Sequence, residues 1–484
     1  MKRNTTAKTF GRIIVTAYAV IIAVASSALA QETDTPVAKD GMISLAEVAP
    51  ELYYSLRRYP EFYGDPNTKV GNLWNRTQLT GNWGGLRDQA TGHGIYLDVS
   101  LTQFIQGNVA DGNKHGTARF NGTVDYWLTL DSGKAGLWPG GALFVHAESS
   151  WQAQKSDNVN GDTGALVPAN FDATMPSNGQ SQSFTVPELY FAQGLPGNLV
   201  LLVGKMNFAG IGDQNLFANN ERTQFLYTAL VNDPILGSFV PYTPLGIALD
   251  WAPSKEHNVA LLGVQGTGNG TTSGFDNFND AYSVGVQYAY SPTIGDRLPG
   301  NYSVIVAYST KDLVDFNVDN RQLIGEIIGL VPVSKKHDNY CIMANIGQYL
   351  WTRDAGQSST DAPSRKGLPP VGVGLFGRVG WEPQDRNVID QFYSFGVGGY
   401  GGFPGRDRDQ WGVGWAGTHI SGDLRDALRV LGRRPNEFEH AIEAFYNFAV
   451  TPATHLSLDL EVIKSAAASV DTAVVLGTRF QVDF

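Results

Sequence analysis

Two acidic side chains near the end of the chain have the spacing that best suits catalysis. Asp459 and Glu461 are two residues apart in an alternating run, so in an extended strand both point to the same face. Paired carboxylates across a cleft are the groups that hydrolyse glycosidic bonds. Acids that face water inside a hollow protein are a more frequent cause of the same pattern. An enzyme acting on glycans therefore remains an alternative that depends on this one pair.

Motifs for other kinds of chemistry are missing from the sequence. It contains no H-E-x-x-H, P-loop or G-x-S-x-G motif, and its single cysteine, Cys341, excludes both a Cys-rich zinc site and an intrachain disulfide. The eight histidines are scattered, and His257, His419 and His440 have no partner at a metal-ligand spacing. We therefore expect no metal, no cofactor and no catalytic residue.

Three glycine-rich segments match the G-x-G-x-x-G fingerprint of dinucleotide-binding proteins, at residues 372–377, 396–401 and 412–417. None of them sits in a strand–turn–helix unit with an acidic residue at the required distance. We interpret them as strand faces built from glycine, where backbones bend or pack closely. Nucleic acid is not expected as a partner either, because phosphate binding needs a basic surface and this chain carries a formal net charge of −11.

Charged and aromatic side chains on the less apolar faces of the predicted strands form a second candidate group. Charges that face lipid cost about 2–4 kcal/mol near the middle of a bilayer, so in a membrane barrel they are expected to face the water-filled lumen. A passage for neutral polyols needs hydrogen-bonding groups and aromatic faces without a strong net attraction for ions. The candidates on the wall are Asp98, Asp125, Trp127, His146, Glu148, Asp250, Arg378, Asp459 and Glu461. Glu221 and Arg222 join them from the irregular segment 213–242, which we expect to fold into the lumen.

A repeat of two residues in the hydropathy of the chain predicts the elements that carry these side chains. In residues 95–102 the odd positions are apolar and the even ones mostly polar, and the same alternation recurs, for example in residues 120–130, 282–290 and 455–462. We count about sixteen strands from residue 94 to the end, joined alternately by short turns and longer loops. A second irregular segment, 418–436, contains a predicted short helix at 423–430.

The C-terminal run and the composition indicate that these strands cross a membrane. Alternating residues from Val474 lead to a terminal phenylalanine, Phe484, the usual end of bacterial outer-membrane barrels and the signal that their insertion machinery recognises. After the N-terminal segment no apolar run reaches the 18 or so residues of a membrane helix. We therefore predict an all-β, antiparallel transmembrane barrel whose partners include outer-membrane lipid and that insertion machinery.

The N-terminal residues have a different character. Residues 1–30 show a positive start, an apolar run and an Ala-Leu-Ala cleavage site, which together predict a signal peptide for export. Its removal takes away four positive charges and changes the formal net charge from −11 to −15. Residues 31–78 are predicted to form a partly helical periplasmic extension, and residues 79–484 the barrel.

Several segments between residues 79 and 484 resemble the carbohydrate-selective porins. Residues 79–87 (LTGNWGGLR) resemble the T-G-[DN]-W-G-G-x-R entry motif of that family, and residues 136–141 (GLWPGG) its hairpin after the second strand. Residues 376–383 (FGRVGWEP), 392–398 (FYSFGVG) and 443–446 (EAFY) follow in the family's order. The final hairpin departs from the pattern, because SAAAS at 465–469 stands where family members often have an Asn-Pro-Gly-like turn.

The resemblance implies a sixteen-stranded, monomeric-type porin of the Gram-negative outer membrane. Carbohydrates, by default monosaccharides such as glucose, would diffuse passively through it into the periplasm. A general or anion-preferring diffusion porin of the same fold is the first alternative, and an outer-membrane enzyme on glycans the second.

Overall fold

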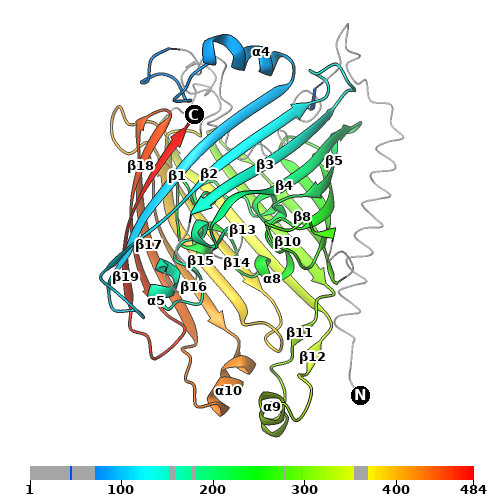
Figure 1. The fold of residues 1–484 in the computed structure, drawn as a ribbon, viewed down its shortest axis with the longest axis vertical. Coiled ribbons are helices and arrows are strands. Elements are labelled where there is room, and N and C mark those ends of the chain that lie inside the picture. The colour runs from blue at the N-terminus through cyan, green and yellow to red at the C-terminus, as the bar shows by residue number, and fades with distance from the viewer. Residues whose placement is uncertain are drawn as a thin grey trace.

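The computed structural model describes residues 44–45, 71–151, 158–176, 180–275, 280–295, 297–353 and 369–484. In these residues sixteen antiparallel strands form a closed barrel (Figure 1). The barrel strands are β1 (Ile95–Ala110), β2 (Thr117–Asp131), β3 (Gly141–Trp151), β4 (Gln182–Leu195), β5 (Leu199–Lys205), β6 (Leu245–Trp251), β7 (His257–Gln265), β8 (Tyr282–Tyr290), β10 (Leu298–Ser309), β13 (Asn339–Thr352), β14 (Gly372–Trp381), β15 (Ile389–Tyr400), β16 (Gln410–Ile420), β17 (Phe438–Thr451), β18 (Thr454–Lys464) and β19 (Ala473–Asp483). The predicted fold class is confirmed.

The barrel closes where its first and last strands pair. β1 pairs with β2 on one side and with β19 on the other, so that Phe104 stands between Asn121 and Arg479. Closure leaves no free sheet edge, which the interior of a bilayer would not tolerate. Three shorter strands complete the sheet structure of the described residues: β9 (Thr293–Ile294) pairs with β10, and β11 (Leu313–Val314) pairs with β12 (Lys335–Lys336).

The two faces of the barrel differ in polarity, as the alternation predicts. The outside carries exposed apolar residues along neighbouring strands, among them Leu375, Phe395, Val413, Ile442, Leu458 and Leu476. On β1 the intervening residues Asp98, Ser100 and Thr102 are buried toward the inside. Strand residues alternate between faces, so one alternating sequence supplies both a lipid-facing surface and a polar lumen wall.

The two ends of the barrel carry connections of different length. The end that holds the C-terminus has mostly short turns, whereas the opposite end carries α9 (Asn320–Ile327) and α10 (Gly422–Val430) on long loops (Figure 1). Short turns face the periplasm and long loops the cell exterior in outer-membrane barrels. The helix predicted at residues 423–430 is confirmed as α10. Among the described residues, no helix has the length and hydropathy needed to span a membrane.

The segment before β1 caps the turn end. It contains η3 (Trp83–Gly85) and α4 (Leu86–Gly92), and the buried guanidinium of Arg87 donates to the carbonyls of Gly81 at 3.0 Å and Phe484 at 2.7 Å. The Leu79 N–H donates to the carbonyl of Asp483 at 2.6 Å. The motif that resembles a family signature therefore binds the end of the last strand.

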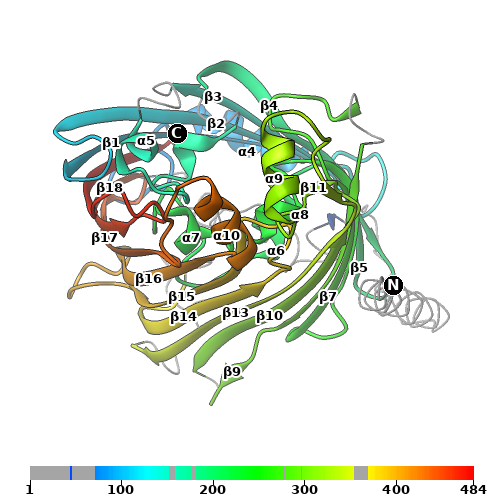
Figure 2. The ribbon, with the colours of Figure 1, turned by 90° about the horizontal axis from the view of Figure 1, so that it is seen from below.

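Two connections on the loop side fold back into the barrel. The connection between β5 and β6, residues 206–244, contains α6 (Phe208–Gly212), α7 (Thr228–Val231) and α8 (Leu236–Phe239), which lie inside the ring of strands (Figure 2). Residues 158–176, with α5 (Val159–Thr163) and η4 (Asp172–Thr174), follow β3, and we call them the second inward segment. We call residues 206–244 the inward loop. The buried apolar core forms where this loop contacts the wall, with Phe217, Phe225 and Phe239 at most 2% exposed.

Candidate functional site

The candidate pathway is a cavity of about 480 Å³ between the inward loop and the wall. Trp127 of β2 and His146 and Glu148 of β3 line it from the wall. Glu221 and Arg222 line it from the inward loop. The structure thus brings together five residues that we predicted for the pathway, from segments about 70 to 100 residues apart.

Amide side chains make up a large part of the cavity lining. They are Asn207, Gln214, Asn215, Asn219, Asn220, Gln224, Asn232 and Gln410. Each amide offers both donors and acceptors and carries no net charge. Aromatic rings of Trp127, Tyr242 and Tyr400 and the ring of Pro370 line the same space. The lining therefore suits a neutral solute that has many hydroxyl groups.

Asp125 lies behind the lining and binds the residues in front of it. The Nη2 atom of Arg222 lies 2.9 Å from Asp125 Oδ1, and the same nitrogen is 3.6 Å from Asp172 Oδ1 in the second inward segment. His146 Nε2 is 2.7 Å from Asp125 Oδ1, and the ring of Trp127 stacks on the His146 ring at a centroid distance of 3.9 Å. Arg222, His146 and Trp127 are thus held in place through Asp125 and through each other.

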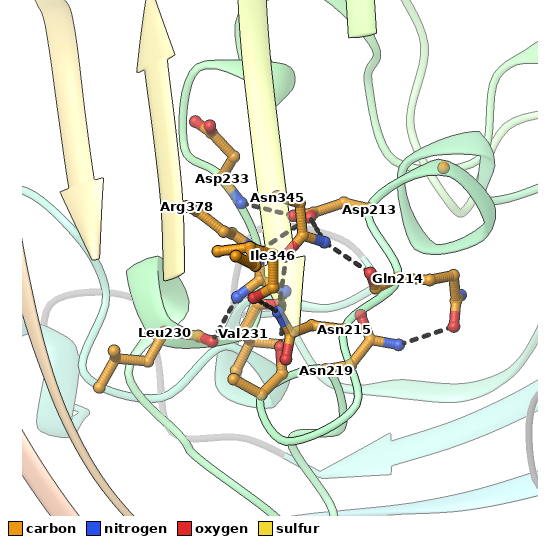
Figure 3. Close-up of polar contacts among 12 residues, drawn as sticks. Asp213, Gln214, Asn215, Asn219, Leu230, Val231, Asp233, Asn345, Ile346 and Arg378 are labelled. Carbon is orange, nitrogen blue, oxygen red and sulfur yellow. Dashed lines mark hydrogen bonds and ion pairs between the residues drawn. The ribbon is translucent and has the colours of Figure 1, made fainter. Parts of the chain in front are cut away.

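Arg378, also predicted for the pathway, is only 1% exposed and contacts the inward loop (Figure 3). Its Nε donates to Asp213 Oδ1 at 2.8 Å, and its terminal nitrogens donate to the carbonyls of Ala218, Leu230 and Val231 at 2.5–3.1 Å. Asn345 on the neighbouring strand β13 donates to Asp213 Oδ1 and to the Gln214 carbonyl. This guanidinium binds loop backbone, so it positions the side chains that line the cavity.

The remaining predicted residues lie away from this cavity. Asp250 lines a second cavity of about 570 Å³ on the β6–β8 side, where its Oδ1 accepts from Asn258 at 2.7 Å. Glu461 is fully buried, and its Oε1 accepts from Gln106 at 3.2 Å. Asp459 is 5% exposed, and Asp98 lies near Gln78 at the turn end. Gln214 and Asn215 border both cavities, so this part of the inward loop lies between them.

Several residues that hold the inward segments were missed by the sequence analysis. Arg479 donates to the carbonyls of Glu221 and Gln224. The carboxylate of Glu443 accepts from the N–H groups of Leu226 and Tyr227 at 2.6 and 2.9 Å. The alternation of the last strand was a usable signal for Arg479, because it puts this residue on the face opposite Phe480.

The second inward segment is held in the same way and was not predicted. Glu439 accepts from the N–H groups of Leu166 and Val167 at 2.7 and 2.8 Å. The Phe171 N–H donates to the carbonyl of Leu226 at 3.0 Å, so the two segments also bind each other. Residues 158–176 carry no periodic pattern that would have indicated a folded plug.

Glycines on β14 to β16 accept the aromatic residues of the inward loop. A Cβ atom added at Gly398 would lie 2.8 Å from Phe217 Cβ, and one at Gly412 would lie 2.8 Å from Phe225 Cζ. Gly374 and Gly414 face the same two rings. The three fingerprint-like segments are therefore strand faces whose missing side chains make room for the loop, which confirms their interpretation as glycine-built strands.

Comparison with known proteins agrees with this architecture. Residues 115–484 match the model of the carbohydrate-selective porin, OprB family. The curated protein Porin B of Pseudomonas aeruginosa is 23% identical over 439 residues, which are 85% of this chain and 92% of that protein. The high-pH structure of Pseudomonas putida OprB superposes with a TM-score of 0.70 at 19% identity, over 85% of this chain and 99% of that one. The low-pH structure of the same protein gives a TM-score of 0.50 at 15% identity, with the same coverage.

The family model spans well over half of the chain. These findings place the barrel in the Gram-negative outer membrane as a carbohydrate porin. The chain belongs to the carbohydrate-selective porin, OprB family.

Proposed function

We propose that neutral monosaccharides such as glucose pass through the amide-lined cavity by passive diffusion, in contact with Trp127, Glu148, Glu221 and Arg222. The observation that carries this proposal is the composition of the lining, in which uncharged amides outnumber the charged side chains. Hydroxyl groups can exchange hydrogen bonds along such a wall, and the ring of Trp127 offers an apolar face to sugar C–H groups. No energy input or cofactor is needed.

The lining does not attract anions strongly, because its guanidinium is already paired with buried carboxylates. Arg222 is within hydrogen-bonding distance of Asp125, and it approaches Asp172 as well. An anion entering the cavity therefore meets a guanidinium that is already engaged, whereas a sugar needs only local exchange of hydrogen bonds. This argument disfavours the anion-preferring porin, whose passage would need unpaired positive charge.

We also propose that the protein has no catalytic activity. Asp459 and Glu461, the pair on which an enzyme would depend, are buried in the wall and line neither of the two lumen cavities. Family membership implies a channel. Release of reducing sugar from an oligosaccharide by the purified porin, lost in Asp459→Ala, would revive the enzyme hypothesis.

Export, insertion and lipid contact complete the proposal. Residues 1–30 would act as a signal peptide and residues 31–78 as a periplasmic extension, although nearly all of these residues lie outside the part of the chain described. The extension ends at the turn side beside the C-terminus, which agrees with a periplasmic place. Leu476 and Phe480 are exposed on the outer face of β19, where outer-membrane lipid and the insertion machinery would contact the last strand.

The test is the swelling of liposomes that contain the purified protein. We expect isotonic glucose to enter faster than a zwitterionic amino acid of similar size, and Arg222→Ala to reduce this preference several-fold. The matched control is Arg429→Ala, an exposed arginine paired with Asp426 on α10, far from the cavity lining. Equal entry of both solutes would reduce the proposal to a general pore. A transport rate that saturates with chloride concentration but not with glucose concentration would favour an anion-preferring pore.

A further inference from the structure

We propose that Asp125, His146 and Glu148 bind a divalent transition-metal ion, of which Zn²⁺ is the probe of choice, in the wall of the lumen. One donor atom from each of the three side chains lies within 4.8 Å of the others, and all three residues are buried. Zinc binds His nitrogen and carboxylate oxygen at about 2.0–2.2 Å, so small side-chain adjustments bring these atoms to a common ion.

Unpartnered carboxylate oxygens mark the place where a cation would bind. Asp125 Oδ1 is engaged by Arg222 and His146, but Asp125 Oδ2 and Glu148 Oε1 have no hydrogen-bond partner among the described residues. Asp125 is 0% and Glu148 1% exposed. A buried carboxylate oxygen without a partner is costly, and a cation is the partner that satisfies several such oxygens at once.

Glu188 on β4 orients the histidine as metal sites commonly do. Its Oε1 lies 3.2 Å from His146 Nδ1, and its Oε2 accepts from the Asn207 N–H at 2.7 Å. A carboxylate on Nδ1–H fixes the tautomer and turns the lone pair of Nε2, which lies 2.7 Å from Asp125 Oδ1, toward the ion. Trp127 stacks flat on the same ring and limits its rotation.

The charges around the cluster favour a divalent ion. Four buried carboxylates, of Asp125, Glu148, Asp172 and Glu188, face one guanidinium, that of Arg222, and one imidazole. Even with His146 protonated, negative charge remains in excess. An ion that replaces the proton between Nε2 and Asp125 adds two positive charges in place of one. A nitrogen donor with two carboxylates selects Zn²⁺ or a similar transition metal over Ca²⁺ or Mg²⁺.

Calorimetric titration of the full mature protein in detergent, stripped with chelator and without sugar present, tests the proposal. We expect one Zn²⁺ per chain. Glu148→Gln keeps the side-chain shape but removes a ligand, and should weaken binding at least tenfold. Glu188→Gln should weaken it ten- to a hundredfold through the orientation of His146. Heat-modifiable migration on gels shows that each variant is folded.

Two variants serve as matched controls. Glu461→Gln changes another buried lumen carboxylate with an unpartnered oxygen, and His337→Gln removes an exposed histidine that pairs with Asp312. Both should bind Zn²⁺ like the wild type. Absence of stoichiometric binding, or equal affinity in Glu148→Gln and wild type, would overturn the site. Loss of binding in His337→Gln would also overturn it, because the ion would then sit at the surface. None of these outcomes depends on sugar transport.

Discussion

Individual buried charges in this barrel hold backbone in place. Arg378 and Arg479 bind carbonyls of the inward loop, while Glu443 binds its N–H groups. Hydrogen bonds to charged groups contribute about 1.5–3 kcal/mol each, roughly twice the value for neutral pairs. Because these charges come from strands of the barrel, the backbone that carries them is already ordered when the loop docks.

Replacement of Arg378 should therefore release the loop without opening the barrel. Arg378→Ala leaves Asp213 buried without its cation, and we expect the docked loop to lose about 3–5 kcal/mol. Single-channel recordings in planar bilayers should show a larger, noisier conductance and weaker discrimination between solutes. Arg353→Ala removes an arginine from an exposed pair with Asp407 and should change neither property, since such pairs contribute at most about 1 kcal/mol. An unchanged conductance in Arg378→Ala would contradict the anchoring role.

At this scale the sequence predicted which side chains point inward but not what they contact. Successive side chains of a strand point to opposite faces, so the position of a residue in its strand is enough to place Arg378, Glu148 and Asp125 inside. Whether an inward charge lines the pathway or binds a loop depends on where a segment more than a hundred residues away folds. That information is not local, so Arg378 was expected in the pathway and Arg479 was not noticed.

Among the elements, β14 to β16 and the inward loop form one packing unit. The strands have glycine at positions 374, 398 and 412. Phe217 and Phe225 of the loop occupy the space that larger side chains would fill there. Glycine lowers strand propensity, and here the packing of aromatic rings offsets that loss. The repeated glycines showed that something approaches these strands closely, but they could not show that it is the chain's own loop.

A methyl group at Gly398 should disturb this packing. In Gly398→Ala the new carbon meets Phe217, and we expect overpacking to cost about 1–3 kcal/mol. A lower unfolding temperature and a less stable conductance are the expected results. The added mutation Phe217→Ala should restore part of the loss, which a double-mutant cycle measures. Gly263→Ala on β7 is the control, since the nearest atom to its Cβ would be Ile247 Cγ2 at 3.8 Å. An equal loss of stability in Gly398→Ala and Gly263→Ala would argue against specific packing of Phe217 on Gly398.

On the scale of the whole molecule, both ends of the barrel are held together. The segment before β1 covers the turn end, and ion pairs connect the loops at the other end. On the loop side, Lys336 lies 3.1 Å from Asp315 and 3.2 Å from Asp385, and Asp385 also pairs with Arg386 at 2.7 Å. Burial by itself raises the pKa of Asp385, but hydrogen bonds and charge from Arg386 and Lys336 outweigh it and lower the pKa below its usual value. These ion pairs connect residues 310–338 to the turn after β14.

Acid should loosen this connection. Because the folded-state pKa of Asp385 is depressed, its contribution is present above the unfolded value of about 3.9 and disappears as the pH falls through the folded value. We expect proteolysis of residues 310–338 to accelerate below about pH 4, while the barrel stays intact. Asp385→Asn should show the faster cleavage already at pH 7. Asp426→Asn, in an exposed pair, should cleave like the wild type at both pH values.

The barrel itself, with about sixteen strands, was the most predictable feature. Hydropathy alternates with a period of two along the barrel sequence, and the alternation within each strand depends only on the residues of that strand. The predicted inward segment at 213–242 falls within the inward loop, and the predicted helix at 423–430 matches α10. The second inward segment, residues 158–176, was not predicted because its fold depends on Glu439 from a distant strand.

The side chains that anchor the inward loop also impose a sequence of events on the making of the pore. The loop is synthesised between β5 and β6, yet its partners Arg378, Glu443 and Arg479 belong to β14, β17 and β19. The chain must therefore reach its last strand before the loop can dock. A barrel captured midway through insertion would be a wide ring with an undocked loop, and selectivity for solutes would appear only as the final step of its biogenesis.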